Sequence, residues 1–101
     1  MSKLVVLTAS ILMFPVLHAE SLIRMATTTS TDNSGLLRYL LPEFENDTQH
    51  KVHVIAVGTG KALRMASDGD VDIVLVHAPG AEKKFVESGA GVKRYPVMYN
   101  D

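Results

Sequence analysis

The sequence predicts an α/β fold in which a parallel β-sheet carries helices on both faces. Three observations predict it. Short apolar runs alternate along the chain with segments of helical periodicity, which is typical of βαβ units. The run Val54-Ile55-Ala56-Val57 is continuously apolar, as expected of a strand that is covered on both faces. The loops after the apolar runs are rich in Gly and hydroxyl residues and lead directly into helices.

Residues 1–19 predict a secretory signal peptide rather than a part of this fold. Lys3 gives a positive start, residues 4–17 are almost wholly apolar, and Ala19 offers a small residue for cleavage. The apolar run is shorter than the roughly 17–25 residues that an ordinary transmembrane helix needs. An uncleaved anchor is the alternative. Cleavage after Ala19 predicts that residues 20–101 are periplasmic.

Residues 22–26 predict the first strand, which ends in five consecutive hydroxyl side chains. The next segment predicts a helix that Asn33 or Ser34 caps and that Pro42 kinks or restarts. Its apolar stripe consists of Leu36, Leu37, Leu40, Leu41 and Phe44. The polar residues near its end are expected to face solvent: Glu43, Glu45, Asn46 and Asp47.

The remaining chain continues the same alternation. The expected elements are a strand at residues 52–57, a helix at 61–67, a strand at 71–76, a helix that stops at Gly89, and a fourth strand that opens at 92–99. Parallel connections are right-handed in about 98% of cases. A sheet that ends on a bare fourth strand leaves an open edge, so we expect a missing remainder.

Composition narrows the function classes. A chain of 101 residues has room for one small domain, and its lack of Cys removes the usual staple of small exported domains. The formal net charge is −1 and no basic stripe appears, which argues against a nucleic-acid partner. A nearly neutral protein that binds an anion must use local dipoles and hydroxyl groups.

Three predicted loops reach the carboxyl edge of the sheet, where ligands of open parallel sheets bind: residues 27–31, 58–60 and 77–80. Helix N-termini offer free N–H groups there, which favour an anion. Several hydroxyls together can surround a tetrahedral oxyanion because each donates one proton. The alternatives are a helix cap for residues 27–31 and a tight turn with positive φ for Gly58-Thr59-Gly60. His77 is either a ligand contact or, more commonly, a satisfied loop residue.

Catalysis and metal binding have little support in the sequence. Gly60-Lys61 lacks the remaining residues of a phosphate-binding loop, and no nucleophile elbow occurs. His50 and His53 fall on opposite faces of a strand, which is poor geometry for one metal. The acidic turn around Asp70 lacks the twelve-residue calcium loop. We therefore expect no enzyme activity, no cofactor and no resident metal.

Several motifs in unbroken order resemble the tungstate-binding proteins of bacterial ABC importers. They are Ala26-Thr27-Thr28-Thr29-Ser30-Thr31, Ser34-Gly35-Leu36-Leu37, Leu41-Pro42-Glu43-Phe44-Glu45, the run from Val54 to Leu63, the run from Gly69 to Pro79, Glu82-Lys83-Lys84-Phe85-Val86, and Val97-Met98-Tyr99-Asn100-Asp101. The resemblance covers essentially all of the chain after residue 19.

The resemblance implies a monomeric periplasmic protein that clamps tungstate or molybdate between two α/β lobes and delivers it to a membrane permease. Residues 20–101 would be the N-terminal part of lobe I of this type II periplasmic binding protein, with the second lobe absent. It implies oxyanion contacts by Thr28, Ser30 and Thr59. Thr29 is included among the predicted contacts, and Thr27 stays open. The alternatives are a binding-incompetent remnant, an interaction module, or an enzyme that acts on a phosphorylated metabolite.

Overall fold

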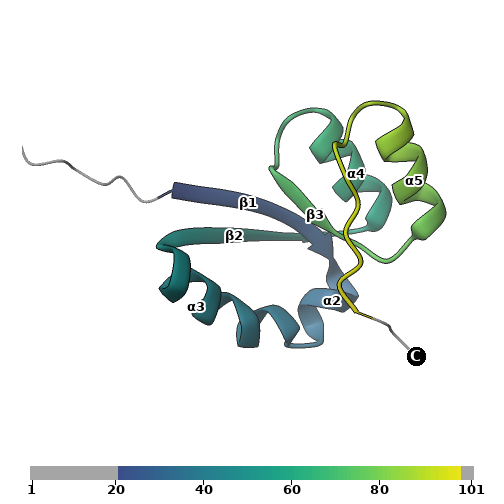
Figure 1. Cartoon of the computed structure of the whole chain (residues 1–101). Coiled ribbons are helices and arrows are strands. Elements are labelled where there is room, and N and C mark those ends of the chain that lie inside the picture. Colours follow the sequence, from purple (N-terminus) through teal and green to yellow (C-terminus); the bar gives the residue numbers. More distant parts are fainter. Residues whose placement is uncertain (1–20, 99–101) are drawn as a thin grey trace, which may run out of the picture.

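The computed structural model describes residues 21–98, so the predicted signal peptide lies outside the described part of the chain. Strands and helices alternate within it (Figure 1). In chain order they are β1 (Ser21–Thr28), α2 (Thr29–Asn33), α3 (Leu36–Thr48), β2 (His50–Val57), α4 (Thr59–Ser67), β3 (Ile73–Leu75) and α5 (Pro79–Glu87). None of the helices in residues 21–98 has the length and apolar content needed to cross a bilayer.

The strands form one parallel sheet in the order β2-β1-β3. The ladder between β1 and β2 runs from Ser21 opposite His50 to Thr28 opposite Val57. The ladder between β1 and β3 is short and reaches from Met25 to Thr27, which lies opposite Leu75. β1 is the central strand, and the register places the last residues of β2 and β3 beside its own end, at Thr28 and Thr27.

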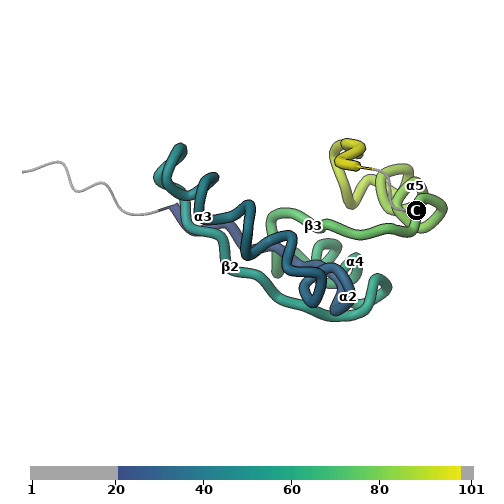
Figure 2. Tube along the Cα trace, turned by 90° about the horizontal axis from the view of Figure 1, so that it is seen from below, coloured from purple at the N-terminus to yellow at the C-terminus, as the bar shows by residue number. Residues whose placement is uncertain are grey.

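The helices cover both faces of the sheet, which confirms the predicted fold class. The first crossover leads from β1 to β2, and the second leads back over β1 to β3. Right-handed crossovers in opposite directions place their helices on opposite faces. Accordingly, α3 lies on one side of β1 while α4 and α5 lie on the other (Figure 1). The helix α3 runs alongside β2 and is in contact with it (Figure 2).

The core lies between α4 and the middle of the sheet. Ala26 of β1 and Ala62 of α4 are both fully buried, and Val71 joins them at 7% exposure. Partly buried side chains of β2, of α4, and of β3 with the residue after it surround this centre: Ile55, Val57, Met65, Ala66, Val74 and Val76. Small residues at positions 26 and 62 allow α4 to pack closely on β1.

The first helical segment differs from the prediction. It consists of two helices, α2 and α3, with Gly35 between them. The φ of Gly35 is +84°, a left-handed conformation that glycine adopts without strain. The predicted cap by Asn33 or Ser34 is wrong, because Gly35 is the N-cap of α3 and Asn33 belongs to α2. Ser34 precedes the cap, and its Oγ accepts a hydrogen bond from Leu36 N–H at 3.2 Å. The prediction that Pro42 restarts the helix is wrong, because α3 continues through it to Thr48.

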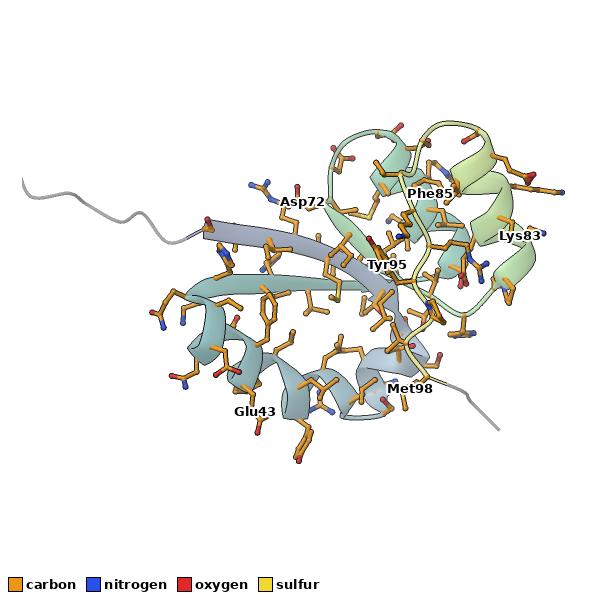
Figure 3. The ribbon with its side chains drawn as sticks, in the orientation of Figure 1. Glu43, Asp72, Lys83, Phe85, Tyr95 and Met98 are labelled. Atoms are coloured by element: carbon orange, nitrogen blue, oxygen red, sulfur yellow. The ribbon has the colours of Figure 1, made fainter. Side chains whose placement is uncertain are left out.

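The solvent-facing prediction for the end of α3 is confirmed for Glu43, which points away from the sheet (Figure 3), and for the exposed Asn46 and Asp47. It is wrong for Glu45. Glu45 is half-buried, and its carboxylate accepts a hydrogen bond of 2.7 Å from Val52 N–H of β2. A charged acceptor on a strand amide contributes roughly 1.5–3 kcal/mol. This contact helps to fix the second half of α3 against β2.

The first two strands are longer than the sequence predicts. β1 extends two residues beyond the predicted end, because Thr27 and Thr28 stay in the ladder opposite Ala56 and Val57. β2 begins at His50 rather than at residue 52. Ala56 is exposed, so this strand is covered less completely than its apolar run predicts.

The third strand spans only three residues, and the described part of the predicted fourth strand is not a strand. Just before β3, Asp72 is joined to β1 by two hydrogen bonds: its N–H donates to the Arg24 carbonyl at 2.9 Å, and its Oδ2 accepts from Arg24 N–H at 2.9 Å. β3 ends early because β1 turns into α2 directly after Thr28. Residues 92–98 find no paired neighbour within the described chain, and a strand requires such a partner.

Candidate functional site

The carboxyl ends of the three strands meet at one edge of the sheet, as the sequence predicts. β1 ends at Thr28, beside the last residue of β2, and β3 ends at Leu75 beside Thr27. Each strand end leads into a helix within four residues: α2, α4 and α5 begin at Thr29, Thr59 and Pro79. This edge therefore gathers three loops and three helix starts (Figure 1).

The hydroxyl of Thr28 lies at the centre of a hydrogen-bonded cluster at this edge. Thr28 is buried and is the N-cap of α2, where its Oγ1 accepts a hydrogen bond from Thr31 N–H at 3.2 Å. The same oxygen donates to Thr31 Oγ1 at 2.8 Å and lies 3.2 Å from Ser30 Oγ. Three hydroxyl groups are thus brought within hydrogen-bonding range.

An imidazole from the third loop completes this cluster. His77 Nε2 lies 3.3 Å from Thr28 Oγ1 and also 3.3 Å from Ser30 Oγ. The strand ladder accounts for this contact, because Leu75 is opposite Thr27 and the chain then passes beside the end of β1. We call Thr28, Ser30, Thr31 and His77 the hydroxyl–imidazole cluster.

The predicted contact residues separate into distinct environments. Thr28 and Ser30 belong to the cluster. Thr29 is exposed and is not among its hydrogen-bonded hydroxyls. Thr59 is half-buried on the neighbouring loop, where it begins α4. Contact of these four residues with an oxyanion stays a prediction.

Thr27 has a structural role in this chain. It is fully buried, and its Oγ1 donates a hydrogen bond of 2.7 Å to the carbonyl oxygen of Leu75. The hydroxyl thereby ties β1 to β3 and does not join the cluster. Strand alternation places neighbouring side chains on opposite faces, which explains why Thr27 and Thr28 point to different partners.

The glycines of the second loop do not serve a left-handed turn. Gly58 is the N-cap of α4 with φ of −75°, and positive φ occurs at neither Gly58 nor Gly60. The predicted alternative of a turn with positive φ is therefore wrong. A side chain at either position would meet open space within 4 Å. The N–H groups in the first turn of the nine-residue α4 have no hydrogen-bond partner inside the helix. These N–H donors lie next to the open space at Gly58 and Gly60.

The third loop supplies its own acceptor to its helix. Glu82 Oε2 accepts a hydrogen bond of 2.7 Å from Ala78 N–H, and Glu82 Oε1 accepts one of 3.0 Å from Arg94 Nε. The N-terminus of α5 is thus capped by a carboxylate of its own first turn. The first turn of α4 carries no acidic residue, whereas that of α2 contains Asp32, so among these helix starts an added anion is favoured at α4.

Replacing Glu82 with alanine is expected to lower the free energy of unfolding by about 1–2 kcal/mol, because the Ala78 N–H loses its acceptor. Arg94→Ala is the matched control. It removes only the half-exposed partner of the same carboxylate and should cost less than about 1 kcal/mol. Chemical denaturation of both variants measures the difference. Equal losses would contradict the assignment of Glu82 as the cap of α5.

A surface hollow elsewhere does not coincide with this site. It is lined by Pro42, Glu45, Asn46, Gln49 and Lys51 at the opposite edge of the sheet, where β2 begins. The hydroxyl and Gly-rich loops that the sequence singles out lie at the carboxyl edge, away from this hollow.

Comparisons with known proteins agree with the predicted resemblance. The model of the PBP superfamily domain matches residues 18–101. The chain is 57% identical over 84 residues to the tungstate-binding protein TupA of Peptoclostridium acidaminophilum, covering 83% of this chain and 29% of that relative. It thus spans less than a third of that relative's length.

Solved structures give the same result for the fold. The tungstate-binding protein TupA from Desulfovibrio alaskensis G20 superposes with a TM-score of 0.79 at 58% identity, over 80% of this chain and 32% of that one. The tungstate ABC transporter structure from Geobacter sulfurreducens gives a TM-score of 0.78 at 58% identity, over 83% and 36% of the two chains. The resemblance and the α/β fold predicted from the sequence are confirmed.

Proposed function

Because the chain belongs to the PBP superfamily domain family, we propose that it is the solute-binding component of an ABC importer for tungstate or molybdate. The observation that carries this proposal is the position of the hydroxyl–imidazole cluster, at the same sheet edge as the open N-terminus of α4. The names of the similar tungstate-binding proteins supply the ligand class.

In this proposal, residues 20–101 are the N-terminal part of lobe I, and a second lobe supplies the opposite wall of the cleft. The exposed apolar side chains of the described chain support further packing: Leu22, Tyr39, Leu40, Phe44, Ile73, Val92, Tyr95, Val97 and Met98. Tyr95 and Met98 lie on the extended segment that follows α5 (Figure 3). Residues 1–19 would direct the protein to the periplasm, where it acts as a monomer and meets its permease.

The proposed capture uses dipoles rather than full charges. A tetrahedral dianion has only acceptor oxygens, and hydroxyl and amide groups are donors of matching kind. The first turn of α4 adds free N–H groups and the partial positive charge of a helix start. Thr59 lies at that start, and the Thr28 and Ser30 hydroxyls lie at the neighbouring strand end. Tungstate and molybdate are nearly equal in size and charge, so this arrangement accepts both.

Binding experiments require both walls of the cleft. They use the two-lobed protein, meaning the complete reading frame that contains this chain or the Desulfovibrio protein with residues 21–98 of this chain in place of its matching segment. Calorimetric titration is expected to show strong binding of tungstate and little response to sulfate or phosphate. Equal or greater affinity for phosphate would contradict the proposed function.

Replacing Thr59 with alanine in the two-lobed protein should weaken tungstate binding by roughly 10- to 150-fold, since a hydrogen bond to a charged group contributes roughly 1.5–3 kcal/mol. Thr59→Ser keeps the hydroxyl and serves as the matched control, with affinity close to that of the unchanged protein. Calorimetry measures both. If the alanine and serine variants bind alike, the Thr59 hydroxyl does not contact the anion.

A further inference from the structure

We propose that His77 is a positioning residue of the oxyanion site, which donates its Nε2–H into the hydroxyl–imidazole cluster and thereby turns the Ser30 proton toward the ligand. This inference rests on the proposed function and deepens it. Sequence reasoning left His77 open, because only the strand register brings it to Thr28 and Ser30. Its distances of 3.3 Å to both hydroxyl oxygens allow it to act on the two together.

The proton count at Thr28 Oγ1 is the first step. A hydroxyl oxygen donates one proton and accepts at most two hydrogen bonds. The Thr28 proton goes to Thr31 Oγ1 at 2.8 Å, and one lone pair receives Thr31 N–H at 3.2 Å. One lone pair is left, and both Ser30 Oγ at 3.2 Å and His77 Nε2 at 3.3 Å lie close enough to donate to it.

The tautomer of His77 decides which of the two donates. If Nε2 carries no proton, it accepts a hydrogen bond, and the Ser30 or Thr28 proton is used inside the cluster. If Nε2 carries a proton, the imidazole occupies the remaining lone pair of Thr28. Ser30 Oγ then lies 3.3 Å from a donor and can itself accept from it, so the Ser30 proton has no acceptor within the cluster.

An oxyanion discriminates between these two arrangements. Its oxygens accept hydrogen bonds and donate none when it is fully deprotonated. The arrangement with protonated Nε2 leaves the hydroxyl protons of Ser30 and Thr31 free to point outward. The other arrangement uses the Ser30 proton inside the cluster and so withdraws it from the ligand. The first arrangement is therefore the one that binds tungstate, and His77 selects it.

The test compares three substitutions of His77 in the two-lobed protein by calorimetric titration with sodium tungstate. In His77→Gln the side-chain amide nitrogen reaches about as far along the chain as Nε2 and keeps a donor there. In His77→Asn the amide reaches only as far as Nδ1, and His77→Leu has no polar group. We expect the glutamine variant to bind within about threefold of the unchanged protein, and the asparagine and leucine variants to lose about tenfold or more.

Two further measurements separate this role from a purely structural one. Thermal melting should place the three variants close together, because the side chain is exposed and the proposed loss is in binding. In the unchanged protein, nitrogen-15 NMR of the imidazole should show a proton on Nε2, both without and with tungstate. This spectrum decides the question even if a substitution prevents folding.

The outcomes are distinguishable from those of the proposed function. If the unchanged two-lobed protein is folded and does not bind tungstate, the proposed function is wrong. If it binds, and all three variants bind equally or the glutamine variant is as weak as the leucine variant, the role of His77 is overturned. An unprotonated Nε2 in the NMR spectrum overturns it as well.

Discussion

Thr28→Val in the two-lobed protein is expected to lower tungstate affinity by roughly 100-fold or more, the largest binding effect that we predict for a single substitution. Valine keeps the shape of the side chain and removes the oxygen on which the cluster converges. That oxygen contacts Ser30, His77 and both the backbone and the side chain of Thr31. Its loss releases these groups, including the Ser30 hydroxyl that faces the anion, from their positions.

The same substitution removes the N-cap of α2, so the free energy of unfolding should fall by about 1–2 kcal/mol. Thr27→Val is the matched control, because it makes the same change one residue earlier. Thr27 donates to the Leu75 carbonyl and lies outside the cluster, so its valine variant should lose about 1 kcal/mol of stability and keep its affinity. Calorimetry and denaturation measure both effects. Weak binding by the Thr27 variant with normal binding by the Thr28 variant would refute the assignment.

The largest effect on stability is expected for Ala62→Leu. Ala62 of α4 and Ala26 of β1 are fully buried in the same core cluster. Adding side-chain volume to a packed core typically lowers the free energy of unfolding by about 1–3 kcal/mol. Few residues in positions 21–98 are fully buried, so this centre has little surrounding core to absorb the strain. The midpoint of thermal unfolding should fall by several degrees, at about 2–4 °C per kcal/mol for a protein of the larger, two-lobed size.

Ala81→Leu is the control for this prediction. Ala81 is exposed on α5, so the same substitution there should change the stability by less than about 0.5 kcal/mol. Circular dichroism melts of the two variants in the two-lobed protein measure the difference. If Ala62→Leu melts at the same temperature as Ala81→Leu, the packing of α4 on β1 is not as described. Tungstate affinity should also fall in the Ala62 variant, because α4 carries Thr59.

The sequence was sufficient to predict the fold class because the relevant signals are local. The apolar run at Val54–Val57 and the stripe around Leu37 each define an element without knowledge of the remaining fold. Boundaries depend on partners instead. Thr27 and Thr28 stay in the strand because β2 pairs with them, and β3 is short because β1 ends beside it. Pro42 is accommodated because contacts such as that of Glu45 with Val52 hold the helix beyond it.

The site was predictable by position and only partly by detail. The run of hydroxyl residues and the Gly-Thr-Gly loop indicated the correct sheet edge, since parallel strands end together. Thr27 ties β1 to β3 and Thr28 joins the cluster because their side chains lie on different faces of the strand. The approach of His77 to Thr28 depends on the register of β3, which brings together two residues that are 49 positions apart in the chain. Neither relation is visible in a linear pattern.

Anomalous X-ray scattering from tungsten in crystals of the two-lobed protein tests the central claim most directly, because it locates the metal of the anion without reference to any variant. We predict a single strong peak at the carboxyl edge of the sheet, beside the Thr28 side chain, with oxygens in hydrogen-bonding range of the Ser30 hydroxyl and of Thr59. A peak away from this edge, with the hydroxyl–imidazole cluster still bonded only to itself, would contradict the account.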